Sequence, residues 1–316
     1  MTPAPQTTAK PVYRIRNWKD YNDALVRRGS LTLWVDEAPL PAWRYQGPTQ
    51  RGAQFAYSDL AVECLLTLRA VYRLTLRATE GFARSLFGLM GLDLPVPDYS
   101  TLCRRAKTVR ITLPKRSTGP LHLVLDSTGL KVYGEGEWKV RQYGYSQRRT
   151  WLKLHLAVDP QTQEIQAAVV SEPGVTDAEA VPCLFELVEN PVERASADGA
   201  YDRRAVYAEL DRRGARAVIP PRRDAKIRRH GNSSGPRLAR DENLRRIRQV
   251  GRKAWKRESG YHERSLAETA VFRMKMIFGG GVSGRRPLQQ ATEAGIRCRA
   301  LNIMTHQGMP RSERVA

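Results

Sequence analysis

Short apolar runs bounded by turn residues dominate the middle of the chain. Four of these runs predict strands, at 121–126, 151–158, 164–170 and 215–219. The turn residues Asp159-Pro-Gln-Thr-Gln predict a hairpin between the second and the third. Helical periods follow at about 177–189 and 203–213. Three strands in a meander, followed by alternating helix and strand, predict an α/β fold with a mixed sheet.

The residues before this region follow helical periods. Helices are predicted from Asn17 to Gly29, from Ser58 to about Thr79, from Glu80 to Met90 and from Thr101 to Lys107. The stretch 31–35 predicts a short strand or extended segment, and Asp98 or Ser100 can cap the last helix. A helix pair, a Gly/Pro break and a short basic helix are compatible with a helix-turn-helix in which Arg104 and Arg105 contact DNA. An ordinary surface helix with both arginines solvated is the alternative.

The stretch from Tyr261 to Lys275 places polar, reactive side chains on one narrow stripe of a predicted helix. At about 100° per residue, Arg264, Glu268 and Lys275 lie at roughly 300°, 340° and 320° from Tyr261. An adjacent apolar stripe is expected to face the core and comprises Leu266, Ala270, Met274 and Ile277. A carboxylate between two cations suits a site that handles metal and phosphate. A solvated face with i,i+4 ion pairs is the alternative.

Two aspartates upstream favour the first interpretation. Asp126 ends the apolar run 121–126 and is followed by Ser-Thr-Gly. Asp198 precedes Gly199, which permits a sharp turn before the helix at about 203–213. Each aspartate alone is more typical of a turn or cap. Three carboxylates in the order strand, strand and helix could supply the clustered oxygen ligands that two hard divalent cations need.

On these residues the chain resembles the DDE transposases of bacterial insertion sequences, and most closely the insertion-sequence-5 family. The signature Y-(2)-R-(3)-E-(6)-K is matched at Tyr261, Arg264, Glu268 and Lys275. The contexts of the first two acids, 124–130 and 197–202, also fit, as does the amino-terminal stretch 13–31. The resemblance spans roughly residues 13–305.

The resemblance implies an RNase H-like catalytic core with a DDE triad of Asp126, Asp198 and Glu268. It implies Mg²⁺ as the ion, with Mn²⁺ as an alternative, held by the same three acids. It also implies that the protein recognises terminal inverted repeats in double-stranded DNA, cuts strands and joins them to target DNA, acting as a homo-oligomer on DNA. In that reaction Arg264 and Lys275 would neutralise phosphate charge. Tyr261 would contact a phosphate or a base, or pack at the helix start.

A strongly basic segment, 222–257, leads directly into the Glu268 helix. It holds fourteen Lys and Arg residues against three acids, which favours contact with the phosphate backbone over a solvated insertion. Trp138 and Trp255 are candidates for base stacking, with packing as the more common role of such residues.

Composition agrees with a nucleic-acid partner. The 316 residues contain 53 Lys and Arg against 32 Asp and Glu, a net charge of +21. No apolar run is long enough to span a bilayer and the amino terminus is polar, so we expect no membrane association and a cytoplasmic location. The four cysteines are far apart, which argues against a zinc site or a disulfide framework.

The predicted organisation has four parts. Residues 1–12 form a disordered tail, 13–115 a mainly helical DNA-binding region, 116–280 the catalytic domain and 281–316 a basic segment with one short helix near 288–303 that then frays. Two alternatives to a transposase stay open: a structure-specific nuclease with the same core that does not join strands, and a non-enzymatic DNA-binding derivative. Metal-dependent cleavage and strand-transfer products separate the three.

Overall fold

A computed structural model of the chain describes residues 12–35, 42–49, 51–52, 54–132, 151–230 and 237–315. The predicted tail 1–12, apart from its last residue, and the predicted stacking residue Trp138 lie outside these residues. The remaining expectations about helices and strands can be compared with the structure.

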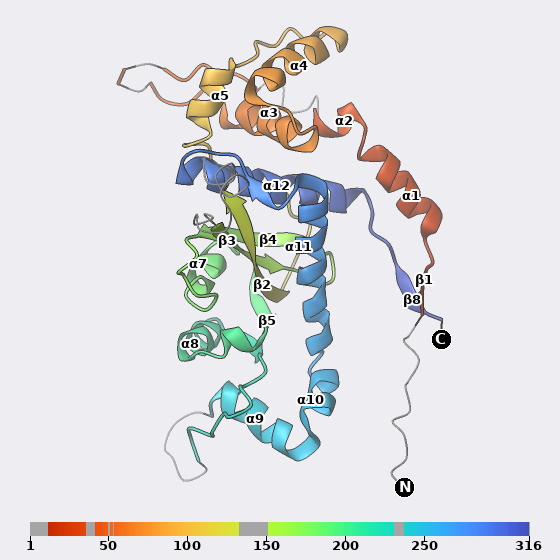
Figure 1. The fold of residues 1–316 in the computed structure, drawn as a ribbon, viewed down its shortest axis with the longest axis vertical. Coiled ribbons are helices and arrows are strands. Elements are labelled where there is room, and N and C mark those ends of the chain that lie inside the picture. Colours follow the sequence, from red (N-terminus) through yellow and green to blue (C-terminus); the bar gives the residue numbers. More distant parts are fainter. Residues whose placement is uncertain are drawn as a thin grey trace, which may run out of the picture.

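A six-stranded mixed sheet forms the centre of the molecule, with strand order β4-β3-β2-β5-β6 and β7 beside β2 (Figure 1). The strands are β2 (Leu121–Val132), β3 (Trp151–Val158), β4 (Ile165–Ser171), β5 (Val192–Ser196), β6 (Arg216–Val218) and β7 (Gly281–Val282). The first three strands pair antiparallel, whereas β5, β6 and β7 are added in parallel. The predicted hairpin between β3 and β4 is confirmed, and the mixed α/β class holds.

Strand β2 is twice as long as predicted, so Asp126 lies in its middle and not near its end. The extension arises because antiparallel pairing with β3 continues from Val124 opposite Val158 to Lys131 opposite Trp151. The polar Ser127, Thr128 and Gly129 break the apolar run without ending the strand.

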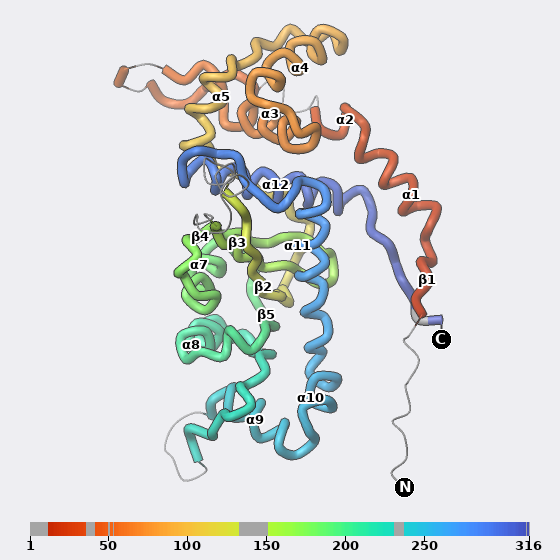
Figure 2. Tube along the Cα trace, viewed as in Figure 1, coloured from red at the N-terminus to blue at the C-terminus, as the bar shows by residue number. Residues whose placement is uncertain are grey.

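Helices cover both faces of this sheet (Figures 1 and 2). One face packs against α11 (Ser265–Phe278) and α12 (Pro287–Gln307), and the other against α7 (Val181–Glu186) and α8 (Arg204–Arg212). Alternation along β2 assigns its side chains to these two layers. Val124 and Leu130 belong to the core under α11 and α12, whereas Leu123 and Leu125 belong to the core on the α7 side. Helix α7 is shorter than the helix predicted at 177–189.

Helix α12 corrects the prediction for residues 281–316. The helix predicted near 288–303 is present but longer: it is 21 residues long and lies between the sheet and the amino-terminal helices, and the chain after it forms a short strand instead of fraying. Its interior is polar in part, so apolar periodicity does not reveal it. Asn302, fully buried, accepts from the Ile165 backbone N–H at 2.8 Å and donates to the Ile165 and Pro114 carbonyls. The side-chain amide thus completes the hydrogen bonding of the β4 edge.

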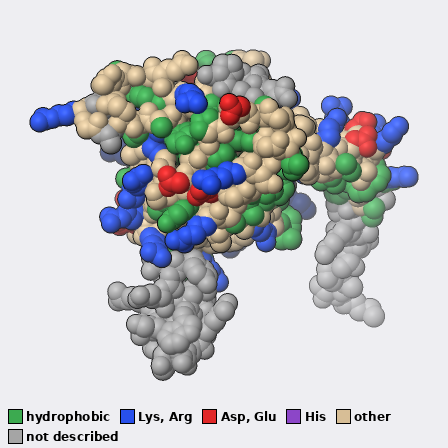
Figure 3. All heavy atoms as spheres, turned by 90° about the horizontal axis from the view of Figure 1, so that it is seen from above, with side chains coloured by type: hydrophobic (Ala, Val, Ile, Leu, Met, Phe, Trp, Pro, Cys, Tyr) green, Lys and Arg blue, Asp and Glu red, His purple; other side chains and the backbone are tan. Residues whose placement is uncertain are grey.

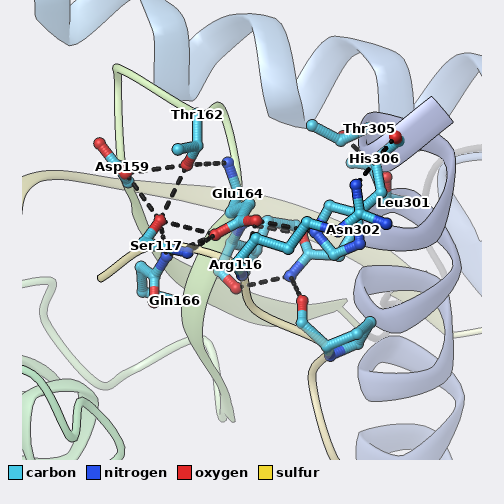
Figure 4. A network of polar contacts seen from close by, with 12 residues as sticks. Arg116, Ser117, Asp159, Thr162, Glu164, Gln166, Leu301, Asn302, Thr305 and His306 are labelled. Atoms are coloured by element: carbon cyan, nitrogen blue, oxygen red, sulfur yellow. Dashed lines mark hydrogen bonds and ion pairs between the residues drawn. The ribbon is translucent and has the colours of Figure 1, made fainter. Parts of the chain in front are cut away.

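A buried acidic residue joins the same region to the segment before β2 (Figure 4). Glu164 accepts from the backbone N–H groups of Arg116 and Ser117 at 2.8 and 3.0 Å, and lies 2.7 Å from Nε2 of His306 on α12. These bonds outweigh burial, which by itself would raise the pKa of Glu164, and leave that pKa lowered. The network ties the β3–β4 hairpin to the end of α12.

The amino-terminal region is mainly helical, and two of its predictions were wrong in detail. It contains α1 (Trp18–Arg27), α2 (Leu31–Trp34), α3 (Asp59–Val71), α4 (Leu76–Leu89) and α5 (Tyr99–Arg105). The stretch 31–35 is a helical turn and not a strand. The helix predicted from Ser58 to Thr79 is two helices, because the chain turns at Arg73, with φ +52°, and Thr75 caps α4. Viewed over these helices, Lys and Arg side chains are scattered across the surface (Figure 3).

The two chain ends form a separate ribbon beside α1. Strand β1 (Tyr13–Ile15) pairs antiparallel with β8 (Ser312–Arg314). Asn17, predicted as the cap of α1, occupies that position but does not cap the helix with its side chain. Its amide donates to the Met309 carbonyl at 3.0 Å and accepts from the Arg311 N–H at 2.7 Å, so it holds the two ends together.

The basic segment 222–257 is largely folded. It contains α9 (Ala239–Val250) and α10 (Arg252–Glu258), which lead through a 3₁₀ turn, η3 (Tyr261–Arg264), into α11. Arg240 pairs with the buried Asp202 at 2.8 Å and anchors α9 next to the sheet. Within the described residues, no helix has the length and apolar character needed to cross a membrane.

Candidate active site

Parallel pairing of β2 with β5 brings the two predicted aspartates to equivalent positions. Val124 is the register partner of Ser196, so Asp126 and Asp198 each lie two residues further along neighbouring strand paths. Asp198 follows the end of β5 in extended conformation. Because side chains alternate along a strand, the two aspartates point to the same side of the sheet.

That side is the one covered by α11. Val124 and Leu130 belong to the core under that helix, and Asp126 lies an even number of residues from both along β2, so its side chain points to the same face of the sheet. Burial raises the pKa of Asp126, and the nearby carboxylates of Glu268 and Asp198 raise it further, against the opposing effects of the Ser127 backbone and Arg264. The three predicted acids therefore lie close enough to act on one another electrostatically.

Asp198 begins a tight turn that orients its carboxylate. Its Oδ1 accepts from the Ala200 backbone N–H at 2.8 Å, which starts the 3₁₀ turn η2 (Gly199–Tyr201). The helix predicted at 203–213 then follows as α8. One carboxylate oxygen of Asp198 thus has a backbone donor.

Glu268 stands in the first turn of α11, half exposed, and its carboxylate pairs with the Arg264 guanidinium. Burial by itself would lower the pKa of Arg264, but Tyr261, Glu268 and Asp126 outweigh it and raise that pKa. Arg264 therefore stays charged and acts on Asp126 as well as on Glu268. It provides the positive charge that allows like-charged carboxylates to share the site.

The four residues of the predicted polar stripe do not all lie in one α-helix, because the segment begins with a 3₁₀ turn. Tyr261 and Arg264 lie in η3, and α11 begins at Ser265. The left-handed Gly260, with φ +68°, separates this turn from α10. The buried face of α11 consists of Ala267, Ala270, Met274 and Phe278, so Ala270 and Met274 of the predicted apolar stripe are confirmed, whereas Leu266 and Ile277 are only partly buried. The 3₁₀ turn rotates the start of the segment relative to a continuous α-helix.

Two cations lie near the Tyr261 ring: Arg264, predicted on the same polar stripe, and Lys256, which sequence reasoning did not connect to it. The Nζ of Lys256 lies 4.8 Å from its ring centroid, and the Arg264 guanidinium carbon lies 5.8 Å away. Trp255, predicted as a stacking candidate, is buried and packs beside Tyr261 with ring centroids 6.1 Å apart. Its role is therefore packing. Lys275 is half-buried two helical turns after Glu268, on the same side of α11.

The amino-terminal arginines differ from each other. Arg105 is buried, pairs with Asp59 and donates to the Tyr57 carbonyl at 2.6 Å. It fixes α5 to α3, and this buried position contradicts the predicted contact of Arg105 with DNA. Arg104 is exposed on the same short helix, and its guanidinium bonds only the Thr101 hydroxyl within the described residues.

The donor set suits a hard divalent cation, although the three acids do not converge on one point. Among the described residues, no three Asp, Glu, His or Cys side chains are grouped closely enough to hold a metal. The Glu268 carboxylate is engaged by the Arg264 guanidinium in this structure. Oxygen ligands supplied by a rigid sheet and one helix fit Mg²⁺ or Mn²⁺ once Glu268 is released.

Comparison with known proteins defines the class. Two family models, both described as "Transposase DDE domain", match residues 26–135 and 117–303. The second match covers more than half of the chain, so this protein belongs to the DDE transposase domain family. Among solved structures, the cryo-EM structure of a piggyBac transposase synaptic complex with hairpin DNA is similar at 12% identity, with a TM-score of 0.36, over 90% of this chain and 75% of that chain.

The burial of Asp126 leads to a stability prediction. Asp126→Asn removes a carboxylate whose folded-state pKa is raised, so above that pKa the ionised group opposes folding. We expect the metal-free variant to melt on the order of 2 °C higher than the parent at pH 7. The gain should vanish below pH of about 4, where the group is protonated in both the folded and the unfolded state.

Thermal unfolding in the presence of a chelator measures this effect. Glu193→Gln, on the exposed side of β5, serves as the control and should leave the melting temperature unchanged. A lower melting temperature for Asp126→Asn at pH 7 would contradict the electrostatic cost assigned to the site.

Proposed function

We propose that this DDE transposase is an active enzyme that cuts DNA strands at terminal inverted repeats and joins them to target DNA, with Asp126, Asp198 and Glu268 as its catalytic acids. The observation that carries the proposal is the shared register of Asp126 and Asp198 beneath α11, with Glu268 in electrostatic reach. An RNase H-like core and membership in the insertion-sequence-5 family are part of the same proposal, as is a bacterial, cytoplasmic setting.

The three acids would hold two Mg²⁺ ions, or Mn²⁺ in their place. Bound there, such ions activate an attacking oxygen and stabilise the leaving 3′ oxygen of an in-line displacement. The protein contributes rigidity through the sheet, which fixes Asp126 and Asp198. The Glu268 side chain is half-exposed, so it would be able to change its orientation when the ions bind.

Arg264 would then act on the substrate. Its guanidinium neutralises Glu268, and a DNA phosphate is the natural replacement partner because the guanidinium can donate two hydrogen bonds to it. Arrival of phosphate at Arg264 would free Glu268 to turn toward the aspartates. Lys275 would add charge on the same side of α11, and Tyr261, flanked by Lys256 and Arg264, would contact the DNA backbone.

A basic concavity of about 510 Å³ lies between α8 and the segment after β6, and two acids, Asp202 and Asp224, also line it. Its cationic lining comprises Arg203, Arg204, Arg222, Lys226, Arg228 and Arg240. Arg240 is neutralised by Asp202, but the other five form no ion pair with any described residue. Free cations on a concave surface favour a polyanion over solvent alone, so we assign this surface to the phosphate backbone of DNA flanking the cleavage site.

The helical amino-terminal region would recognise the inverted repeats, with Arg104 as the exposed contact on α5. Simultaneous capture of two element ends would require a homo-oligomer on DNA. Strand transfer distinguishes this protein from a nuclease with the same core.

Substitution of the acids tests the chemistry. Asp126→Asn, Asp198→Asn and Glu268→Gln keep side-chain shape but remove the charge that binds hard cations. Each should abolish Mg²⁺-dependent cleavage and strand transfer on a pre-bound inverted-repeat duplex while leaving binding close to that of the parent. Combined substitutions should lose no more activity than single ones, because the acids act as a unit.

The controls must be acids without structural partners. Asp159, Asp202 and Glu263 are unsuitable because Asp159 bonds Ser117 and Thr162, Asp202 pairs with Arg240, and Glu263 pairs with Arg194 and His122. Glu193→Gln and Asp211→Asn are exposed alternatives and should retain full activity. Cleavage that survives Glu268→Gln would contradict the assignment of the third acid. Cleavage without joined products would indicate a nuclease.

The basic concavity is tested by salt dependence. Arg204→Ala, Arg222→Ala and Arg228→Ala should each weaken DNA binding regardless of sequence. Each should also flatten the plot of log affinity against log salt, by about 0.9 for every phosphate that the variant no longer binds. Arg212→Ala is the matched control, since that arginine on α8 already pairs with Glu209 at 2.7 Å. An unchanged slope in the triple variant would show that the concavity does not touch DNA.

A further inference from the structure

A polar cluster joins the turn before α11 to the two strands that lead to the proposed catalytic aspartates. Glu263, in η3, accepts a hydrogen bond from Nη2 of Arg194 on β5 at 2.6 Å, and the same Oε2 lies 2.9 Å from Nδ1 of His122 on β2. The other ring nitrogen of His122 lies 2.8 Å from Oγ of Ser196, at the end of β5. One carboxylate on the turn thus engages side chains of both strands.

The cluster lies on the face of the sheet that carries the acids. His122 precedes Asp126 by four residues along β2, and Arg194 precedes Asp198 by four along the path of β5, so the side chains of each pair point to the same side. His122 and Arg194 are also register partners. The turn η3 contacts both strands. Glu263 therefore reaches each strand four residues before its aspartate.

Burial strengthens the bonds of this cluster. The His122 side chain is 8% exposed and Ser196 is fully buried, whereas Glu263 is half-exposed. Burial and the charge of Arg194 lower the pKa of His122 to about 4, against the opposing effect of Glu263. The imidazole is therefore neutral at pH 7, and its Nδ1 can accept from Arg194 at 2.8 Å. The guanidinium thus bonds the strand and the turn at once.

The backbone of the turn is matched to this cluster. Gly260 has φ +68°, and a Cβ atom there would lie 3.1 Å from Nη1 of Arg194 and 3.4 Å from Oε1 of Glu263. The Glu263 N–H donates to the Gly260 carbonyl at 3.2 Å. Arg264 is the next residue and pairs with Glu268. Contacts that fix Glu263 therefore also fix the backbone from which the Arg264 side chain extends.

We propose that Glu263 is a positioning residue, which holds η3 on β2 and β5 and thereby fixes Arg264 relative to the strands of Asp126 and Asp198. This inference rests on the role proposed for Arg264 toward Glu268 and the DNA phosphate. A cation held in place before the substrate arrives stabilises charge without the cost of rearrangement during the reaction. Glu263 would act through Arg264 and not on the substrate.

Hydrogen exchange tests the attachment of the turn without DNA or metal. In Glu263→Ala the backbone N–H groups of η3 should exchange about tenfold faster or more, because the turn loses a charged hydrogen bond to the sheet. Glu258→Ala is the matched control: Glu258 on α10 is also half-exposed and pairs with Arg246 at 2.9 Å. It should leave exchange in η3 unchanged. Parental exchange of η3 in Glu263→Ala would overturn the proposal.

Cleavage kinetics test the action through Arg264. Glu263→Ala should slow Mg²⁺-dependent cleavage of a pre-bound inverted-repeat duplex by up to about 100-fold and leave duplex affinity close to that of the parent. Adding Glu263→Ala to Arg264→Ala should cause no further loss, because both changes disable one group. Glu258→Ala should cleave at the parental rate.

The outcomes separate this inference from the function on which it rests. Losses that multiply in the double variant would show that Glu263 does not act through Arg264, and parental cleavage by Glu263→Ala would show that positioning is not needed. Either result overturns the positioning role alone. Parental cleavage by Arg264→Ala would instead contradict the role proposed for Arg264, and the positioning role with it.

Discussion

Parallel pairing between β2 and β5 is the constraint on which the site depends. Strand β2 is the only described strand with three partners, β3, β5 and β7, so its position is fixed from both sides. The register that sets Val124 opposite Ser196 also sets Asp126 level with Asp198. A shift of one residue would turn one aspartate to the other face of the sheet. The register of the sheet therefore decides whether the two proposed catalytic aspartates share one face.

The second requirement is electrostatic. Burial raises the pKa of Asp126, and the nearby carboxylates of Glu268 and Asp198 raise it further. Arg264 relieves part of this repulsion from a 3₁₀ turn just before α11, where it acts on both Glu268 and Asp126. If the three acids hold cations as proposed, the empty site opposes folding, which is the usual relation between stability and activity in enzymes.

The catalytic half of the fold followed from local patterns, because its strands are apolar runs and its motifs lie at fixed spacings. The hairpin between β3 and β4 and the order of strand and helix were predicted in this way. Features set by distant contacts were not. The length of β2 depends on its pairing with β3, and the burial of α12 depends on polar residues such as Asn302 that bond the sheet edge. The basic character of Arg105 gave no sign that Asp59 would hold it inside.

Locating the bound metal tests the catalytic role of the three acids most directly. Crystals grown with Mn²⁺ and an inverted-repeat duplex would reveal the ions by anomalous diffraction. We predict anomalous density flanked by the carboxylates of Asp126 and Asp198, with the Glu268 carboxylate turned away from Arg264 and toward the ions. Density bound elsewhere, or ions held by the two aspartates while Glu268 stays paired with Arg264, would contradict that role.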